Sequence, residues 1–465
     1  MVLLPGIRAN LERYPSYTPS AVSILLGSSG ESGRQSRIHP PFFNHSLVNP
    51  KVIYMKNFWQ NLTKPIFALA PMQDVTDCAF REIFAKYGRS SPLLNPPPQG
   101  EEIKIVPLPR GEGLGEGGFV MFTEFVNVDG LLHPEGFKRL KIDLEYTENQ
   151  RPIVAQIWGR DPEKFYAAAK LIAQMGFDGV DINFGCPQDK EIAQKTCAAL
   201  IREPELAGEI IEATIEGAKV NNPSQPPLMV STSSPQALRG GDNHLPVSVK
   251  TRLGYSKTDE MQGWLTHLFK YPLAAITLHA RTKQEKSKVP AHWEKIKEAV
   301  EIRDHMMIGV IARVSAGGGS ASGTTSDEAI LTPNRLSRPS DAFGARNDRT
   351  LIIGNGDIKS REEGLQRIKE TGCDGVMVGR GAFGNPWLFR ADNHQPSIEE
   401  RLGIMLEHAE LYEKMYKGIK SFVAMRKNFK AYISGFEGAN ELRAKLMETE
   451  SAKEAQEVVR SFGFR

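Results

Sequence analysis

Eight short apolar runs that alternate with amphipathic stretches constrain the fold of this chain more than any other feature. The runs occupy 66–70, 120–125, 153–158, 180–184, 247–250, 275–279, 351–354 and 376–379. Between them, apolar residues recur at helical spacing, most clearly at 162–175 and 205–218 and over shorter stretches at 293–302 and 362–371. Strands that alternate with helices form parallel sheets, and eight is the number that closes a (β/α)₈ TIM barrel. A doubly wound sheet rarely needs eight such units, so we predict the α/β barrel.

The sequence on either side of this alternation predicts the domain organisation. Residues 1–54 are rich in Ser, Pro and Arg and poor in acids, which is loosely typical of a transit peptide. We instead expect a disordered or spurious extension there, because the first sustained folded pattern opens at Met55. The barrel is predicted over 55–391. Residues 392–465 carry no strand signal, and helical patterns at 398–417, 421–433 and 439–448 predict a small C-terminal helical domain.

Three biased segments interrupt the barrel pattern, at about 90–118, 221–244 and 304–349. They are rich in Gly, Pro, Ser and Asn, and such compositions bury too little apolar surface to offset the entropy of ordering the chain. Each segment precedes a strand. We therefore predict three low-complexity insertions in αβ connections, at the face of the barrel opposite the catalytic one.

Composition excludes several classes of protein. The net charge of the 465 residues is only +3, so a polyanionic partner would need a local basic surface. The four cysteines form no CxxC pair and none stands with His at zinc spacing, so we expect neither a metal site nor a disulfide scaffold. A reducing compartment, the cytoplasm, is the expected location. No apolar run approaches the length of a membrane span, and we expect a monomer without a membrane partner.

The loop after the fourth run places a thiol between two conformationally special residues. The run ends in Asn183-Phe-Gly185-Cys186-Pro187. Gly185 permits unusual backbone angles, and Pro187 fixes its own. A substrate could reach a cysteine in such a loop. The alternative is that Cys186 is a small buried hydrophobe in a turn, because free Cys is among the most buried residue types.

Polar residues end nearly every other strand, and these ends meet at the catalytic face of a barrel. The glycine-rich loops after the seventh and eighth strands, together with Arg380, suit a phosphate group. A phosphate site and an interior ring of Gln156, Lys250 and His279 suit flavin mononucleotide, whose anionic reduced ring a nearby cation stabilises. Taken alone, Lys250 could instead pair with a core carboxylate, and His279 could be a satisfied core histidine. Their place on adjacent strands favours the cofactor.

Taken in order along the chain, these motifs resemble the tRNA-dihydrouridine synthases. The motifs are Ala70-Pro-Met72, Asn183-x-Gly-Cys-Pro187, Val249-Lys250-x-Arg252, His279-x-Arg281, Asn355-Gly-Asp357 and Gly379-Arg380. The resemblance covers about 64–388 apart from the three biased segments, and it continues into the C-terminal helices. It implies an FMN-dependent barrel with a helical domain, which reduces uridine in tRNA to 5,6-dihydrouridine with NADPH.

The resemblance also implies roles for single residues. Cys186 matches the catalytic acid. The matches to flavin contacts are Pro71, Met72 and Gln73 along the flavin, Gln156, Lys250 and His279 at its ring system, and Asn355, Gly356, Asp357, Gly379 and Arg380 at its phosphate end. One departure from the family follows the Cys-Pro pair, where Cys197 stands in place of a glycine and is expected to stiffen the loop.

The reaction that the resemblance implies fits a thiol and a basic surface. Reduction of the uracil C5=C6 bond needs a hydride at C6 and a proton at C5, and a thiol with a pKa of about 8.5 still carries its proton at neutral pH. Asn183 could bind a base edge and Arg281 a phosphate or a base carbonyl. The uridine has to leave its stack to reach a barrel mouth. Arg426, Lys427 and Lys430 are then expected to contact tRNA phosphates, the alternative being a solvated helix face.

Two other functions are compatible with the sequence. An FMN-dependent barrel reductase that acts on a free pyrimidine or an enone would share the flavin residues, but it would have no use for the basic helix. A catalytically inactive RNA-binding protein would not need Cys186, Lys250 and His279 to be intact.

Overall fold

The computed structural model describes residues 57–89, 118–219, 245–316 and 349–464. The N-terminal extension expected at 1–54 and most of the three biased segments lie outside these residues.

Parallel strands form one ring-like sheet. The strands are β1 (Ile66–Leu69), β2 (Met121–Phe122), β3 (Val126–Asn127), β4 (Ile153–Trp158), β5 (Gly179–Phe184), β6 (Val247–Arg252), β7 (Ala275–His279), β8 (Leu351–Asn355) and β9 (Gly375–Val378). Their spatial order is β1-β9-β8-β7-β6-β5-β4-β2, and β3 pairs with β4. A parallel bridge between Ala68 and Val120 brings β1 beside β2 and completes the ring. The predicted (β/α)₈ barrel is confirmed.

The second strand is the run that the structure divides, whereas the other runs match their predicted bounds to within two residues. It stops after Phe122 and resumes as β3, so two short strands replace the single run expected at 120–125. Thr123 lies in the gap, where its hydroxyl oxygen accepts the Gln156 backbone N–H at 3.1 Å and donates to the Glu124 carbonyl at 2.8 Å. A side chain therefore replaces part of the backbone ladder here, and Glu124 lies between the two short strands.

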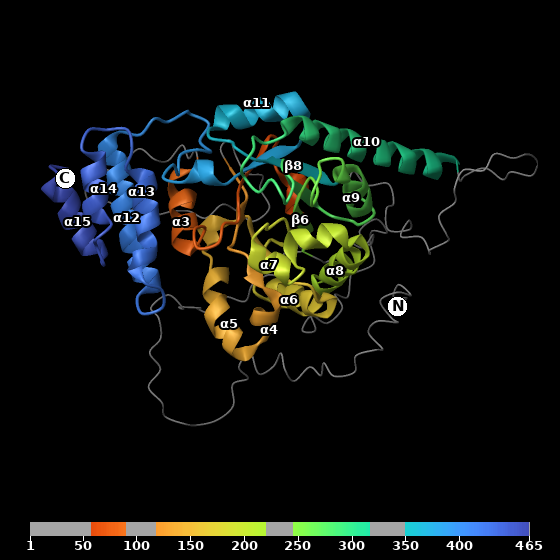
Figure 1. Cartoon of the computed structure of the whole chain (residues 1–465), viewed down its shortest axis with the longest axis horizontal. Helices are drawn as coiled ribbons and strands as arrows, with labels where there is room; N and C mark the ends of the chain where they lie inside the picture. Colours follow the sequence, from red (N-terminus) through yellow and green to blue (C-terminus); the bar gives the residue numbers. More distant parts are fainter. Residues whose placement is uncertain (1–56, 90–117, 220–244, 317–348, 465) are drawn as a thin grey trace, which may run out of the picture.

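Helices surround the sheet (Figure 1). The α-helices of the barrel are α3 (Cys78–Tyr87), α4 (Val128–Leu132), α5 (Pro134–Leu140), α6 (Pro162–Gln174), α7 (Asp189–Ala193), α8 (Pro204–Gly217), α9 (Glu260–Leu268), α10 (Trp293–Ala316) and α11 (Arg361–Thr371). Short 3₁₀ turns are η1 (Phe58–Asn61), η2 (Lys141–Leu144), η3 (Glu148–Gln150), η4 (Cys197–Arg202), η5 (Arg380–Ala382) and η6 (Phe422–Met425). No helix within the described ranges is both long and apolar enough to cross a membrane.

Helix ends follow the residues that can cap them. The Asp77 carboxylate accepts the Phe80 N–H at the start of α3, and the Ser360 hydroxyl accepts the Glu363 N–H at the start of α11. Gly372 ends α11 at φ +71°, a conformation that glycine adopts without steric cost. These local signals set the lengths of the helices that separate consecutive strands.

Helix α10 corrects one predicted boundary. The third insertion was expected to begin at about Asp304, whereas the helix continues to Ala316. The sequence from 305 to 315 still carries Met, Ile, Val and Arg, and the run of glycines begins only at Gly317. Residues 305–316 contain no proline and a single glycine, so no strong helix breaker stops the helix before the composition changes.

The segments between the described ranges each connect a helix to a strand. They lead from α3 to β2, from α8 to β6 and from α10 to β8. The predicted placement of the three insertions in αβ connections is therefore confirmed. Such connections run to the N-terminal ends of barrel strands, away from the catalytic face.

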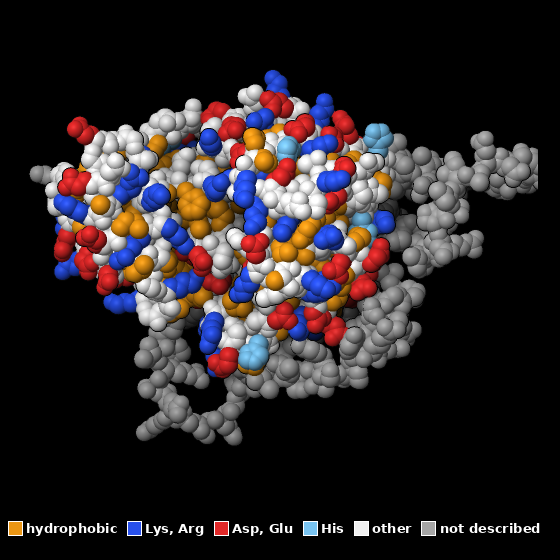
Figure 2. All heavy atoms as spheres, viewed as in Figure 1, with side chains coloured by type: hydrophobic (Ala, Val, Ile, Leu, Met, Phe, Trp, Pro, Cys, Tyr) orange, Lys and Arg blue, Asp and Glu red, His pale blue; other side chains and the backbone are white. Residues whose placement is uncertain are grey.

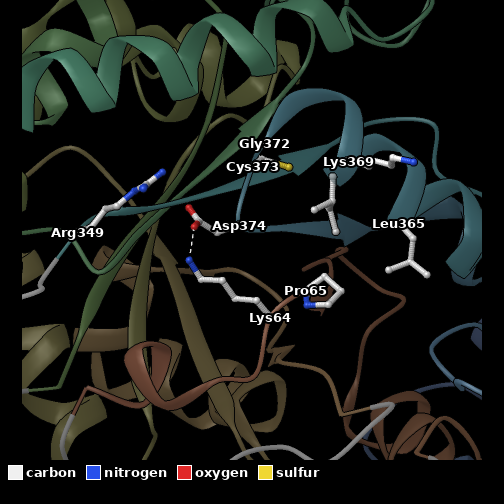
Figure 3. A pocket seen from close by; sticks show the side chains of 9 residues that line it. Lys64, Pro65, Arg349, Leu365, Lys369, Gly372, Cys373 and Asp374 are labelled. Carbon is white, nitrogen blue, oxygen red and sulfur yellow. Dashed lines mark hydrogen bonds and ion pairs between the residues drawn. The ribbon is translucent and has the colours of Figure 1, made fainter.

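The N-terminal end of the barrel is closed by a buried carboxylate. Asp374 precedes β9, and its oxygens accept from Lys64 Nζ at 2.5 Å, from Arg303 Nη1 at 2.5 Å and from the Ile352 N–H at 2.9 Å. A hollow of about 510 Å³ lies beside this group (Figure 3). Ion pairs at this end of a barrel serve stability rather than catalysis.

Four helices follow the barrel, namely α12 (Ile398–Tyr416), α13 (Arg426–Tyr432), α14 (Ala439–Leu446) and α15 (Ala452–Ser461). They pack beside α3 (Figure 1), and one buried cluster combines Ala79 and Ile83 of α3 with Met405, Tyr416 and Phe429 of the C-terminal region. The Cys78 N–H also donates to the Tyr416 hydroxyl at 3.0 Å. The predicted C-terminal helical region is confirmed, and it shares a core with the barrel.

Candidate active site

A pocket of about 680 Å³ opens at the C-terminal ends of the strands. Several of the residues predicted for the site line it, namely Pro71, Gln73, Gln156, Asn183, Cys186, Lys250 and His279. They come from the ends of five strands that are far apart in sequence. Basic and acidic side chains are interspersed over the face drawn in Figure 2.

The Cys186 loop is held from two sides. The Asn183 side-chain oxygen accepts the backbone N–H groups of Gly185 at 2.9 Å and Cys186 at 3.0 Å. From β6, Arg252 Nε donates to the Gly185 carbonyl at 2.7 Å. Cys186 is half-buried and lines the pocket, so it is not a fully buried hydrophobe in a turn.

The environment of Cys186 lowers its pKa. The largest cause is a hydrogen bond with the thiol of Cys197, and the charge of Arg252 acts in the same direction, while burial opposes both. Cys197 is fully buried, and burial together with the Cys186 contact raises its pKa well above the ordinary value. Of the two thiols, Cys186 is therefore the one that ionises first.

A buried polar chain fixes Gln156 inside the barrel. Gln156 Nε2 donates to Asp181 at 2.6 Å, and Ser248 Oγ donates to the other oxygen of the same carboxylate at 2.6 Å. Asn183 Nδ2 donates to Gln156 Oε1 at 3.0 Å. Burial raises the pKa of Asp181 to about 6. Sequence reasoning missed Asp181 and Ser248, although Asp181 stands two residues before Asn183 and shares its face of the strand.

Lys250 presents a cation that no carboxylate neutralises by direct contact. Its Nζ lies 3.1 Å from Asn355 Oδ1, and it forms no ion pair with any residue that the structure describes. Burial, with a further contribution from Arg252, lowers the pKa of Lys250 to about 8. The alternative of a buried ion pair with a core carboxylate is therefore not observed.

His279 stays neutral in this setting. Burial and the neighbouring cations Arg252, Lys250 and Arg281 push its pKa well below the ordinary value. Arg281 Nη1 lies 3.2 Å from His279 Nε2. A guanidinium can only donate, so Nε2 accepts and the proton of the neutral ring is on Nδ1.

Arg281 lies behind His279 rather than in the pocket lining. It is buried, its Nε donates to the Val289 carbonyl at 2.6 Å, and its Nη2 pairs with Asp357. Arg380 contacts the other oxygen of Asp357 at 3.2 Å. The carboxylate, which follows β8, thus aligns one guanidinium group that follows β7 and one that follows β9, and a net positive charge remains at this end of the site.

The backbone beside these groups depends on glycine. Gly356 has φ +142°, and a Cβ there would stand 2.8 Å from the Ala291 side chain. A Cβ on Gly379 would stand 3.6 Å from the Met72 sulfur. Glycine is therefore required at 356, both by its backbone conformation and by the close Ala291 side chain, whereas a Cβ at 379 would make only ordinary contacts.

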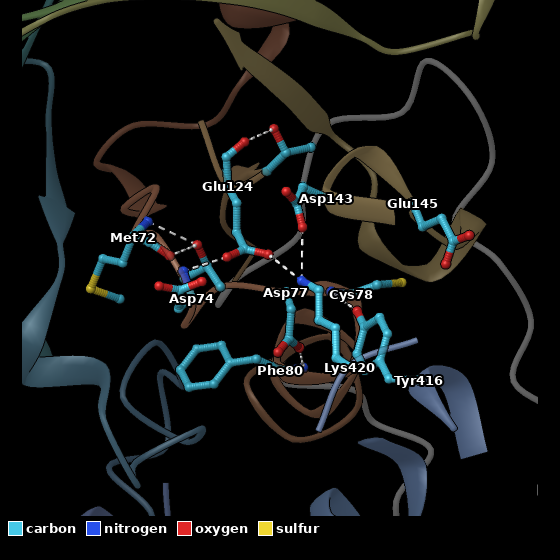
Figure 4. Close-up of polar contacts among 12 residues, drawn as sticks. Met72, Asp74, Asp77, Cys78, Phe80, Glu124, Asp143, Glu145, Tyr416 and Lys420 are labelled. Atoms are coloured by element: carbon cyan, nitrogen blue, oxygen red, sulfur yellow. Dashed lines mark hydrogen bonds and ion pairs between the residues drawn. The ribbon is translucent and has the colours of Figure 1, made fainter. Parts of the chain in front are cut away.

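A second feature missed from the sequence joins the C-terminal region to the pocket (Figure 4). Lys420, in the loop after α12, lies 2.7 Å from Asp143 and 3.4 Å from Glu124, which is fully buried. The other oxygen of Glu124 accepts the N–H of Asp74, in the loop that carries Pro71 and Gln73. We call Glu124, Asp143 and Lys420 the Glu124 cluster. It connects the position of the helical region to that of the pocket wall.

The three basic residues predicted to contact RNA are placed differently from one another. Arg426 donates to the carbonyls of Glu448 and Thr449 at 3.1 to 3.2 Å, so it holds the end of α14. Lys427 is half-buried and acts electrostatically on Asp77 at the start of α3. Lys430 is exposed. In the described part of the chain, no group of three or more His, Cys, Asp or Glu side chains could hold a metal ion.

Comparisons with known proteins connect the chain to one family. The family model described as dihydrouridine synthase matches residues 68–228, 236–313 and 345–463. A protein of Staphylococcus epidermidis named "Probable tRNA-dihydrouridine synthase" is 34% identical over 411 residues, which is 88% of this chain and 97% of that protein. "Probable tRNA-dihydrouridine synthase 2" of Bacillus subtilis is 33% identical over 408 residues, again 88% of this chain and 97% of that protein.

Among solved structures, histamine dehydrogenase from Rhizobium sp. 4-9 superposes with a TM-score of 0.40 at 12% identity, over 76% of this chain and 51% of that one. A similarity this remote supports no conclusion about function.

Proposed function

The chain belongs to the dihydrouridine synthase family, and from that premise we propose that it reduces specific uridines in tRNA to 5,6-dihydrouridine, with bound FMN and with NADPH as reductant. The observation that carries this proposal is the thiol of Cys186. It is held by Asn183 and Arg252 in the same pocket as Lys250 and His279. The proposed proton donor, Cys186, and the cation Lys250 would then act on the same substrate and cofactor in one pocket.

The pocket fits FMN on chemical grounds. Lys250 is a cation without a carboxylate contact, which suits an anionic reduced ring, and neutral His279 can donate from Nδ1. Arg380 and the glycine backbone at 356 suit the phosphate. Asp357 would repel a phosphate, so its part is to align Arg281 and Arg380. When bound, reduced FMN supplies the hydride that C6 of the uracil needs.

Cys186 supplies the proton at C5 in this proposal. The donor has to be protonated before the step and tolerate charge after it. Arg252 and the Cys197 thiol both favour the thiolate that remains once the proton has left. Asn183 keeps the backbone of the loop in place. Its direct contact with a base edge, and that of Arg281 with a phosphate or base carbonyl, stay predictions.

Mass mapping of tRNA tests the proposal. Unmodified tRNA incubated with the protein, FMN and NADPH is expected to gain two hydrogens at discrete uridines, and heat-inactivated protein is the control. Equal reduction of free uridine or uracil would favour a reductase of free pyrimidines. Tight binding of tRNA without any reduction would favour an inactive RNA-binding protein.

The cation at Lys250 is expected to stabilise bound FMN. In Lys250→Met, FMN binding should weaken about ten- to a hundredfold, since a hydrogen bond that involves a charged group contributes about 1.5–3 kcal/mol. The measurement is the FMN dissociation constant by fluorescence quenching, with Lys250→Arg as the charge-preserving control. Unchanged affinity and unchanged reduction by NADPH in Lys250→Met would contradict a role at the flavin.

Lys427 and Lys430 are the basic residues best placed to contact tRNA, because Arg426 is bonded to α14. Changing both lysines to Glu should raise the KM for tRNA. It should also reduce the slope of log affinity against log salt concentration, by about one for each phosphate that the protein no longer neutralises. NADPH oxidation without tRNA should be unaffected. The matched control reverses two exposed lysines of α10 and α11, Lys297 and Lys369. Equal salt slopes in both double variants would identify the helix surface as merely solvated.

A further inference from the structure

The residue that departs from the family pattern, Cys197, stands in a constrained place. It opens η4 at φ +52°, and Lys195 two residues earlier has φ +55°. Non-glycine residues seldom adopt this conformation. Thr196 between them is fixed on Glu191, whose carbonyl accepts its N–H at 3.0 Å and its hydroxyl at 2.9 Å. The loop thus holds the Cys197 side chain in a set direction.

That direction brings two thiols together. The Ala198 N–H donates to the Cys186 carbonyl at 3.4 Å, so the backbones on either side of the two sulfurs are already in contact. The interaction between the two thiols lowers the pKa of Cys186 and raises the pKa of Cys197. Both are free, Cys186 faces the pocket and Cys197 is fully buried.

We propose that Cys186 and Cys197 form a reversible disulfide when the protein meets a hydroperoxide, and that this bond switches off the proton donor. The inference rests on the proposed function for its consequence, but not for the bond itself. A disulfide brings its two sulfurs to about 2.05 Å, and the backbone hydrogen bond from Ala198 to Cys186 already holds the two segments together.

The order of events follows from exposure and ionisation. Cys186 is the thiol that the pocket exposes and the one with the lowered pKa, so its thiolate attacks the peroxide oxygen and the O–O bond breaks. This gives a sulfenic acid on Cys186 and releases the alcohol, or water from hydrogen peroxide.

Cys197 then resolves the sulfenic acid. Its sulfur attacks the Cys186 sulfur, the S–O bond breaks, and the hydroxyl leaves as water with the proton of Cys197. Glu191 is placed to carry that proton, because its buried Oε2 has no hydrogen-bond partner among the described residues and its charge acts on both thiols. Overall, two thiols lose two electrons and two protons, and the hydroperoxide is reduced.

The bond has a direct effect on the reaction at the pocket. A disulfide sulfur carries no proton, so C5 of the uracil would receive none from Cys186. A thiol reductant restores the donor, whereas sulfinic acid at Cys186 would be a permanent loss. The buried partner therefore protects the exposed thiol from deeper oxidation.

Peptide mapping tests the bond without any need for activity. The full-length FMN-loaded protein is treated with hydrogen peroxide, alkylated and digested with trypsin without reduction. The expected product is a peptide ending at Lys190 linked to the peptide 196–202, with loss of two hydrogens, and dithiothreitol should release both. Uridine reduction should fall about a hundredfold on oxidation and recover with dithiothreitol, since the general acid is removed and then regained.

Variants separate this outcome from general damage. Cys197→Gly suits the positive φ and removes the second sulfur, so peroxide should drive Cys186 to sulfinic acid without dithiothreitol rescue. Cys197→Ser is the second variant should the glycine protein fold poorly, and Cys373→Ala at a distant buried site is the matched control. Free or sulfinic Cys186 in oxidised wild type, with no linked peptide, would overturn the proposal. A linked peptide in a protein that never forms dihydrouridine would support the bond and reject the proposed function.

Discussion

Replacement of Cys186 by Ala is expected to leave FMN bound and reducible by NADPH, while dihydrouridine formation falls about a hundredfold or more. The reason is that different strands of the barrel carry the proposed acid and the groups proposed to hold the flavin. Lys250, His279 and Arg380 come from other strands than the Cys186 loop, so the proposed proton donor can be removed without touching the groups proposed to hold the cofactor. Single-turnover formation of dihydrouridine, followed beside flavin reoxidation, measures the two steps separately.

The loop around Cys186 supplies the control for that experiment. Its backbone is fixed by Asn183 and Arg252 through the N–H and C=O groups of Gly185 and Cys186, not through the thiol. Cys186→Ala should therefore keep the loop in place, and its FMN affinity should match that of wild type. Near-normal product formation by this variant would reject Cys186 as the acid, and joint loss of flavin would mean that the loop had collapsed.

The strands were predictable because both faces of a barrel strand are buried. A parallel strand covered on both sides is a nearly continuous apolar run, and such runs mark β4 and β7 at their observed bounds. The second run failed for a local reason, since Thr123 takes over a ladder hydrogen bond and no composition signal reveals that. The extension of α10 was missed because the third insertion was predicted to begin at about Asp304, whereas its glycine-rich part begins only after the helix ends at Ala316.

Site residues at strand ends were predictable for a related reason. The carboxyl ends of parallel strands share one face, so position along a strand is enough to bring Gln156, Cys186, Lys250 and His279 to one pocket. Which atom each side chain then contacts is a tertiary property. Arg281 turned towards Asp357 instead of the pocket, and Arg426 towards the end of α14.

The Glu124 cluster carries no sequence signal at all, because its members are brought together by the docking of the helical region on the barrel. Lys420 and Glu124 are 296 positions apart in the chain. Neither a period nor a motif marks them, and an isolated Lys after a helix is typical of an exposed cap. The contact nevertheless places a buried carboxylate beside the pocket loop at Asp74, so its stability has consequences for the site.

Lys420→Met is expected to destabilise the protein by about 1–3 kcal/mol, the cost of leaving a buried acceptor unsatisfied. Burial raises the pKa of Glu124 to about 7, and Lys420 is the first group that opposes this shift. A carboxyl with a raised folded pKa contributes stability below its unfolded pKa and loses it as the pH rises through the folded value. Without Lys420 the folded pKa rises further, so the destabilisation should be larger at about pH 8 than at about pH 6.

Urea unfolding at the two pH values measures this difference. The exposed Lys417, three residues earlier, provides the matched control as Lys417→Met, which should change stability little at either pH. Glu124→Gln removes the titrating group, so the double variant with Lys420→Met should lose the extra destabilisation at high pH. A loss of stability in Lys420→Met that is equal at both pH values would show that the lysine acts through Asp143 and packing, because Glu124 would then be neutral throughout this range.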